Sequence, residues 1–321
     1  MPRLKEHFRE VLRLHTAGDP MREEVVWTNL TKTEIAHRLE QLGSVVSVNI
    51  VTQLLEDAEY HRRKLRKTRA MGSVPHRNDQ FEYIALLREQ FLREHWPILS
   101  MDSKHREALG PYYRPGRLFA REEVPVYDHD FLHAAQGVLI PHALYDLQRN
   151  VGHLYLGMSH DTSDFACDNV YAWWMRFGRW YYGRADELLL LCDSGGSNSC
   201  RHYVFKESLQ RLADRIGIIL RVAHYPPYTS KYNPIEHRLF PHVTRACAGV
   251  SLTDLDLAAK LMRKTRTSTG LRVTVEVNRK YYATGRTCSA EFLESMPIQF
   301  DADLSSWNYR AVPAGRRLAV E

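Results

Sequence analysis

The order of apolar segments after residue 96 constrains the fold of this chain more than any other feature of its sequence. Short apolar runs with strand character come first, and amphipathic helical segments then alternate with further apolar runs. The expected strands are residues 97–102, 131–147, 151–160, 187–196 and 218–227. The expected helices are residues 163–183, residues 199–217 and a segment that begins near residue 229.

This order, β-β-β-α-β-α-β-α, is the order that an RNase H-like fold requires. We therefore predict an α/β domain over residues 96–275, in which helices cover both faces of a mixed sheet. A small all-helical helix-turn-helix domain over residues 1–72 precedes it in this prediction. A linking helix over residues 73–95 joins the two, and residues 276–321 form a C-terminal extension.

Composition excludes several classes of protein. The 321 residues are 44% hydrophobic and 26% charged, which is typical of a chain that folds around a core. No apolar run is long enough to span a bilayer, and the first twenty residues lack the apolar stretch of a secretory signal. We therefore expect a cytoplasmic protein with no membrane partner. The five cysteines form no CxxC pair, which argues against a disulfide scaffold or a zinc ribbon.

Two short helices are predicted near the N-terminus. Thr31 and Glu34 have the spacing of a capping box, and Ser47 is suited to cap a second helix. Two helices joined by a turn that contains Gly43 indicate a helix-turn-helix, whose second helix enters the DNA major groove. An ordinary helical hairpin explains the same pattern. In the DNA-binding interpretation, the residues that reach base edges are Asn49, Thr52 and Gln53.

A basic run follows the second helix. Residues 61–69 read HRRKLRKTR and contain no acidic residue, within a chain of net charge +6. Such a run can neutralise DNA phosphates, although a solvated helix end has the same composition. The candidate phosphate contacts are Arg62, Arg63, Lys64, Arg66 and Lys67.

Three acidic residues occupy informative positions. Asp102 ends the first predicted strand, Asp193 ends the fourth, and Glu236 lies in the first turn of the helix after the fifth. Ligands of open α/β sheets gather at the carboxyl ends of strands, so these carboxylates are expected to meet there. Carboxylate oxygens suit Mg²⁺ or Mn²⁺, and two such ions can promote in-line displacement at phosphorus.

Each acid also has a purely structural explanation. Asn233, Pro234 and Glu236 have the spacing of a helix start, in which Glu236 completes the cap. Asp102 and Asp193 each precede residues that favour turns.

Longer stretches around these acids resemble one family. SMDSKHRE, DHDF, CDSGGSNSCR, HYPPYTSKYNPIEHRLF and WNY resemble the ISAzo-thirteen (Rhodopirellula-type) DDE transposases of bacterial insertion sequences. The resemblance implies that Asp102, Asp193 and Glu236 hold two Mg²⁺ or Mn²⁺ ions. It further implies that the protein cuts double-stranded DNA at element ends and joins the freed end to target DNA, near the nucleoid. A homodimer on paired ends is a further possibility.

Polar residues beside the acids are the remaining candidates for DNA contact. Lys231 and Arg238 flank Glu236, Lys104 follows Asp102, and Ser197 and Asn198 follow Asp193. Two other functions compete with transposition. One is a non-catalytic DNA-binding protein derived from a decayed or truncated transposase, and the other is an RNase H-like nuclease that cuts without joining.

Overall fold

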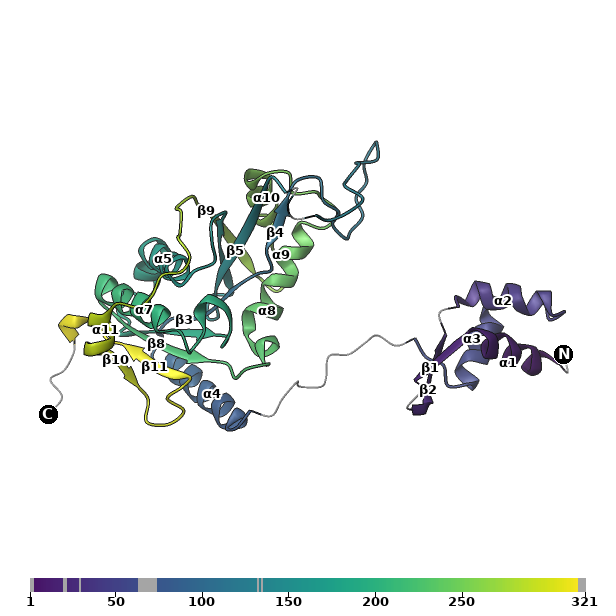
Figure 1. The fold of residues 1–321 in the computed structure, drawn as a ribbon, viewed down its shortest axis with the longest axis horizontal. Helices are drawn as coiled ribbons and strands as arrows, with labels where there is room; N and C mark the ends of the chain where they lie inside the picture. The colour runs from purple at the N-terminus through teal and green to yellow at the C-terminus, as the bar shows by residue number, and fades with distance from the viewer. Residues whose placement is uncertain are drawn as a thin grey trace. The chain divides into compact units, whose positions relative to one another are not determined.

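The computed structural model describes residues 3–19, 22–28, 30–62, 74–131, 133 and 135–316, and it divides the chain into two compact units. The first unit spans Met1–Arg69 and the second spans Ala70–Glu321 (Figure 1). The division falls among residues outside the described part of the chain, and each unit is described by itself below.

The described part of the first unit contains three helices and a two-stranded hairpin. The helices are α1 (Leu4–His15), α2 (Lys32–Gln41) and α3 (Val48–Asp57), and the hairpin pairs β1 (Thr16–Asp19) with β2 (Arg22–Thr28). The expectation of an all-helical domain was therefore wrong. The sequence of β2, REEVVWT, is rich in β-branched and aromatic residues, which favour a strand once a partner strand is available.

The capping residues of the first unit behave as predicted. The Thr31 side chain accepts from the Glu34 N–H, and the Glu34 carboxylate accepts from the Thr31 N–H at 2.7 Å. Ser47 accepts from the N–H of Ile50 at the start of α3. The three helices enclose a core of their own, formed by Phe8, Val11, Leu12, Ile35, Leu39, Val51 and Leu54.

The second unit is built on a nine-stranded mixed sheet of order β10-β11-β8-β7-β3-β5-β6-β9, with β4 paired to β5. Strands β3, β7 and β8 are parallel, and β5 and β6 continue the sheet by antiparallel pairing. The strands are β3 (Ile98–Ser103), β4 (Glu107–Leu109), β5 (Gly137–Asp146), β6 (Val151–Gly157), β7 (Glu187–Cys192), β8 (Ile219–His224), β9 (Arg272–Asn278), β10 (Ile298–Phe300) and β11 (Asn308–Ala311).

Helices cover both faces of this sheet, as an RNase H-like fold requires (Figure 1). Helices α5 (Ser163–Trp173) and α7 (Tyr203–Ile216) pack on one face, together with Leu188 and Leu190 of β7. On the other face, α4 (Arg77–Arg93) packs against Leu189 and Leu191 of the same strand. Because β7 is buried on both faces, its sequence is a continuous apolar run.

Further helices of the second unit lie on the same two faces. Helices α8 (Pro234–Arg238), α9 (Phe240–Ala246) and α10 (Leu255–Met262) cover β5, β6 and β9 on the face that α4 shares. Helix α11 (Ala290–Ser295) contributes Phe292 to the core of the opposite face.

Some predicted boundaries differ from the observed ones. The long helix expected over residues 163–183 is divided into α5, a π-helical turn at Trp174–Gly178 and the short α6 at Arg179–Tyr181. The boundary predicted after residue 275 falls inside β9, and β10 and β11 extend the same sheet. The predicted linking helix corresponds to α4, which packs on the sheet. No helix in the described ranges is long and apolar enough to cross a membrane.

Candidate active site

The ends of two adjacent parallel strands bring the first two acids together. Strands β3 and β7 pair in parallel, with Met101 opposite Cys192. Asp102 and Asp193 are the next residues along, so they lie at the same edge of the sheet. Met101 and Cys192 belong to the core on the α5 and α7 face, and alternation along each strand turns the two acids toward the opposite face.

Helix α8 lies on that opposite face and carries Glu236. Its start is tied to β3 by hydrogen bonds rather than by sequence proximity. The Ile235 N–H donates to the Ser100 hydroxyl at 3.0 Å, and Ser100 donates to the side-chain oxygen of Asn233. Ser100 and Asp102 are two residues apart on one strand, so both face α8. This arrangement places Glu236 beside Asp102.

Burial and neighbouring carboxylates shift the pKa of Asp102 and of Asp193. Burial and the neighbouring charge of Asp193, followed by that of Glu236, raise the pKa of Asp102 to about 8. Burial and the charge of Glu236 raise the pKa of Asp193 to about 6, against a hydrogen bond from Asn233 that lowers it. Like charges held this close in a partly dry site favour either protonation or a bound cation.

The structural explanation of Glu236 as part of a cap does not hold in its simple form. Asn233 is the N-cap residue of α8, but its side chain makes no capping bond to that helix. The side chain is fully buried and faces Ser100, the Met101 carbonyl and Asp193 instead. Sequence reasoning assigned Asn233 to a helix start and missed its contact with the acids.

A fourth carboxylate near the site was also missed. Asp161 follows β6 and accepts hydrogen bonds from the hydroxyls of Ser103 at 3.1 Å and Ser197 at 3.3 Å. Ser103 is adjacent to Asp102, and Ser197 belongs to the loop after Asp193. Burial raises the pKa of Asp161, while the two hydroxyls lower it. Asp161 therefore bridges the end of β3, which carries Asp102, and the loop that follows Asp193.

The donor set fits a hard divalent cation. In the described ranges, no three His, Cys, Asp or Glu side chains are gathered as a ready-made metal site. The carboxylate oxygens of Asp102, Asp193 and Glu236 are nevertheless the kind of ligand that Mg²⁺ and Mn²⁺ prefer. A bound cation would offset the repulsion between the negative charges.

The predicted DNA contacts of the second unit have different surroundings. Lys231 and Arg238 are exposed, and they flank Glu236 in the sequence. Lys104 is 11% exposed and forms an ion pair with Glu107, which also binds Arg114 at 2.6 Å, so Lys104 is not a free phosphate ligand here. Ser197 donates to Asp161, and Asn198 is buried.

The predicted contacts of the first unit are only partly described. Asn49 and Gln53 are exposed on α3. Thr52 is half-buried, donates to the Val48 carbonyl and accepts from Lys32. In the basic run, Arg62 is exposed. The other candidates, Arg63, Lys64, Arg66 and Lys67, lie outside the described residues.

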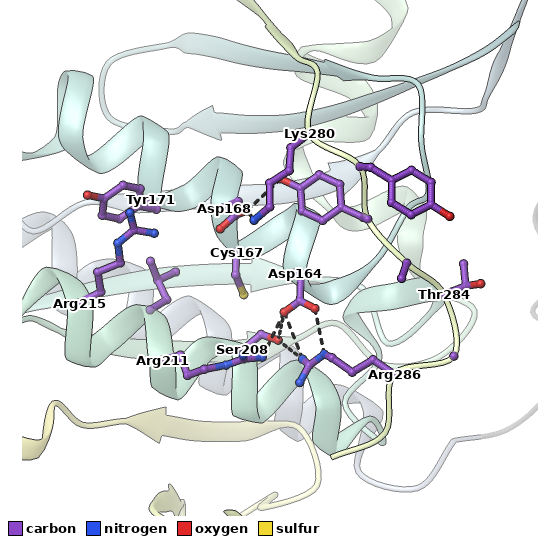
Figure 2. Close-up of a pocket in the computed structure, with 15 residues that line it drawn as sticks. Asp164, Cys167, Asp168, Tyr171, Ser208, Arg211, Arg215, Lys280, Thr284 and Arg286 are labelled. Carbon is purple, nitrogen blue, oxygen red and sulfur yellow. Dashed lines mark hydrogen bonds and ion pairs between the residues drawn. The ribbon is translucent and has the colours of Figure 1, made fainter. Parts of the chain in front are cut away.

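A separate pocket lies between α5, α7 and the segment that precedes α11, and none of the three acids lines it (Figure 2). Ion pairs hold three of its four basic side chains, and the fourth, Arg215, lies over the Tyr171 ring. Arg286 bonds the carboxylate of Asp164 at 2.9 Å and that of Glu207, and Lys280 forms an ion pair with Asp168. This network fastens the segment to both helices, which is a structural role.

Comparison with known proteins identifies the family. A model of the Rhodopirellula transposase DDE domain matches residues 7–313, nearly the whole chain. The chain belongs to this family of transposases. No curated protein matches it.

Solved structures of the Mos1 transposase also align with this transposase. A pre-cleavage Mos1 transpososome is 13% identical, with 80% of this chain and 69% of that chain covered and a TM-score of 0.43. The mariner Mos1 paired-end complex with Mg is 13% identical over 80% of this chain and 68% of that chain, with a TM-score of 0.45.

Proposed function

We propose that this transposase cuts and joins DNA strands by phosphoryl transfer at a site formed by Asp102, Asp193 and Glu236. The observation that carries the proposal is the meeting of three carboxylates at the carboxyl ends of β3 and β7, where burial and neighbouring charge raise the pKa of Asp102 and of Asp193. These residues are distant in sequence, and only the fold brings them together.

The three carboxylates would hold one or two Mg²⁺ or Mn²⁺ ions. When bound, such ions supply positive charge at the reacting phosphate and lower the pKa of a bound water or a DNA 3′-hydroxyl. The chain's own residues would do the rest. Lys231 and Arg238, which are exposed and flank Glu236 in the sequence, would hold DNA phosphates, and the buried strand ends would keep the acids in place.

DNA would be held by both units. The exposed Asn49 and Gln53 on α3 are suited to contact base edges, and the basic run that begins at His61 would neutralise phosphates. One of the aligned Mos1 structures is a paired-end complex with the left transposon end. By analogy we propose that two copies of this transposase act on two element ends.

The experiment that tests the proposal uses the full chain and a labelled duplex that carries the element's terminal sequence, in Mg²⁺, Mn²⁺ or EDTA. We expect metal-dependent nicking at the terminus. Asp193→Asn should reduce it by at least about 10³-fold, because the substitution removes a charged ligand, while the Kd for DNA stays within about twofold of that of the parent.

The alternatives give different results. Binding without cleavage in either metal would indicate a decayed, non-catalytic DNA-binding protein. Cleavage without joining to a target duplex would indicate a nuclease. Cleavage retained in Asp193→Asn would show that the metal site is assigned to the wrong residues.

A further inference from the structure

One buried asparagine contacts all of the elements that carry the acids. Asn233 and Ser100 are each 0% exposed. The Asn233 side chain accepts a hydrogen bond from Ser100, and its amide donates to the Met101 carbonyl at 3.5 Å and to the carboxylate of Asp193. Its backbone starts α8, three residues before Glu236.

The orientation of the Asn233 amide follows from its partners. Ser100 accepts the Ile235 N–H, so its single hydroxyl hydrogen is available to donate to Asn233. Because the Met101 carbonyl can only accept, the Asn233 nitrogen faces Met101 and Asp193, and the Asn233 oxygen faces Ser100. Every hydrogen-bonding atom of this buried side chain thus has a partner, which is the condition for a polar group to hold a core in one arrangement.

The contacts also replace an ordinary helix cap. A typical N-cap asparagine accepts from an N–H of its own first turn. Here Ser100 of β3 accepts the Ile235 N–H instead, and the asparagine is free to reach Asp193. The start of α8 is consequently fixed to the strand that bears Asp102.

We propose that Asn233 is a positioning residue that holds Asp102, Asp193 and Glu236 at the separation at which they bind a divalent cation. It acts through Asp193 directly, through Ser100 and Met101 on the strand of Asp102, and through the helix start on Glu236. This proposal rests on the proposed function, because it assumes that the three acids are the metal ligands.

The test measures Mn²⁺ binding to the full-length protein by isothermal titration calorimetry, together with thermal unfolding and DNA cleavage. Asn233→Ala removes all of the side-chain contacts described above. Ser100→Ala removes the hydrogen bond to Asn233 and the acceptor for the Ile235 N–H. The matched control is Gln210→Ala. Gln210 is a buried amide on α7 that donates to the Val312 carbonyl and to Asp214, and it has no described contact with the acids.

We expect Asn233→Ala to weaken Mn²⁺ binding by about 10- to 100-fold, the usual effect of losing a residue that orients metal ligands. Ser100→Ala should weaken it in the same direction. Gln210→Ala should lower the unfolding temperature and leave the Mn²⁺ affinity within about twofold of the parent, since the loss of a buried amide elsewhere does not reach the acids.

Two outcomes overturn the proposal while the proposed function stands. One is parental Mn²⁺ affinity in Asn233→Ala, and the other is an equal loss of affinity in Gln210→Ala. Failure of the proposed function has a different signature. Either the parent protein binds no Mn²⁺ and cuts no DNA, or Asp193→Asn retains cleavage, and in both cases the role assigned to Asn233 falls with it.

Discussion

At the scale of single residues, Asp102 makes the metal-free protein sensitive to pH. Its pKa is about 8 in the folded protein, against an ordinary value of 3.8. The folded protein therefore binds this proton more tightly than the unfolded chain does. Its contribution to stability is therefore lost as pH rises through that interval, by up to ~1.4 kcal/mol per pH unit. Burial lowers the pKa of His224 from 6.5 to about 4. This histidine therefore reduces the free energy of unfolding only below about pH 6.5.

We therefore expect the free energy of unfolding in EDTA to fall between pH 6.5 and pH 8, and Asp102→Asn to flatten that fall. Urea unfolding at several pH values measures both. The parent in saturating Mn²⁺ serves as the control, because a bound cation offsets the repulsion between the carboxylates. If the free energy of unfolding in EDTA fell with pH as steeply in Asp102→Asn as in the parent, the raised pKa would not belong to Asp102.

Much of the site could be predicted from residues, but two members could not. Asp102, Asp193 and Glu236 followed from their places after predicted strands. Asp161 satisfies the same rule, but its relevance depends on β6 running parallel to β3, which the sequence does not state. Asn233 was assigned only to a helix start. Its contact with Ser100 joins residues more than a hundred positions apart, so no local pattern in the sequence indicates it.

At the scale of elements, the predictable parts were those with a strong local pattern. Strand β7 is a continuous apolar run, and α7 ends at Gly217, which adopts a left-handed φ of 76°. Strand β9 shows alternation in RVTVEVN and could have been found. Strands β10 and β11 have three and four residues, too few for any period, and tertiary pairing alone defines them.

Gly217 gives a prediction at this scale. We expect Gly217→Ala to destabilise the second unit by ~1–2 kcal/mol, because an L-residue is strained in the left-handed region. Gly315→Ala is the matched control, since a Cβ has open space at both positions and only Gly217 has a positive φ. Denaturant unfolding of the two variants should therefore diverge. Equal stabilities would show that the backbone at position 217 relaxes without cost.

At the scale of the whole molecule, the proposed role of the basic run in DNA binding can be tested by the salt dependence of DNA affinity. Arg62, Arg63, Lys64 and Arg66 belong to the basic run that lies, in sequence, between the core residues of the two units. Changing all four to Ala should weaken binding to every DNA sequence and reduce the slope of log K against log salt by up to ~4, about one for each phosphate that is no longer neutralised. A slope equal to that of the parent would assign the run to a solvated surface.

The two units have separate hydrophobic cores, and this has a consequence for the element that encodes the chain. A premature stop codon beyond the first unit would leave Phe8, Ile35 and Val51 with all their core partners, whereas the sheet would lose β11 from beside β8. Such fragments would keep α2 and α3, for which DNA contact is proposed, and would lack a complete catalytic unit. If the first unit binds element ends as we propose, such fragments would compete with the intact transposase for those ends.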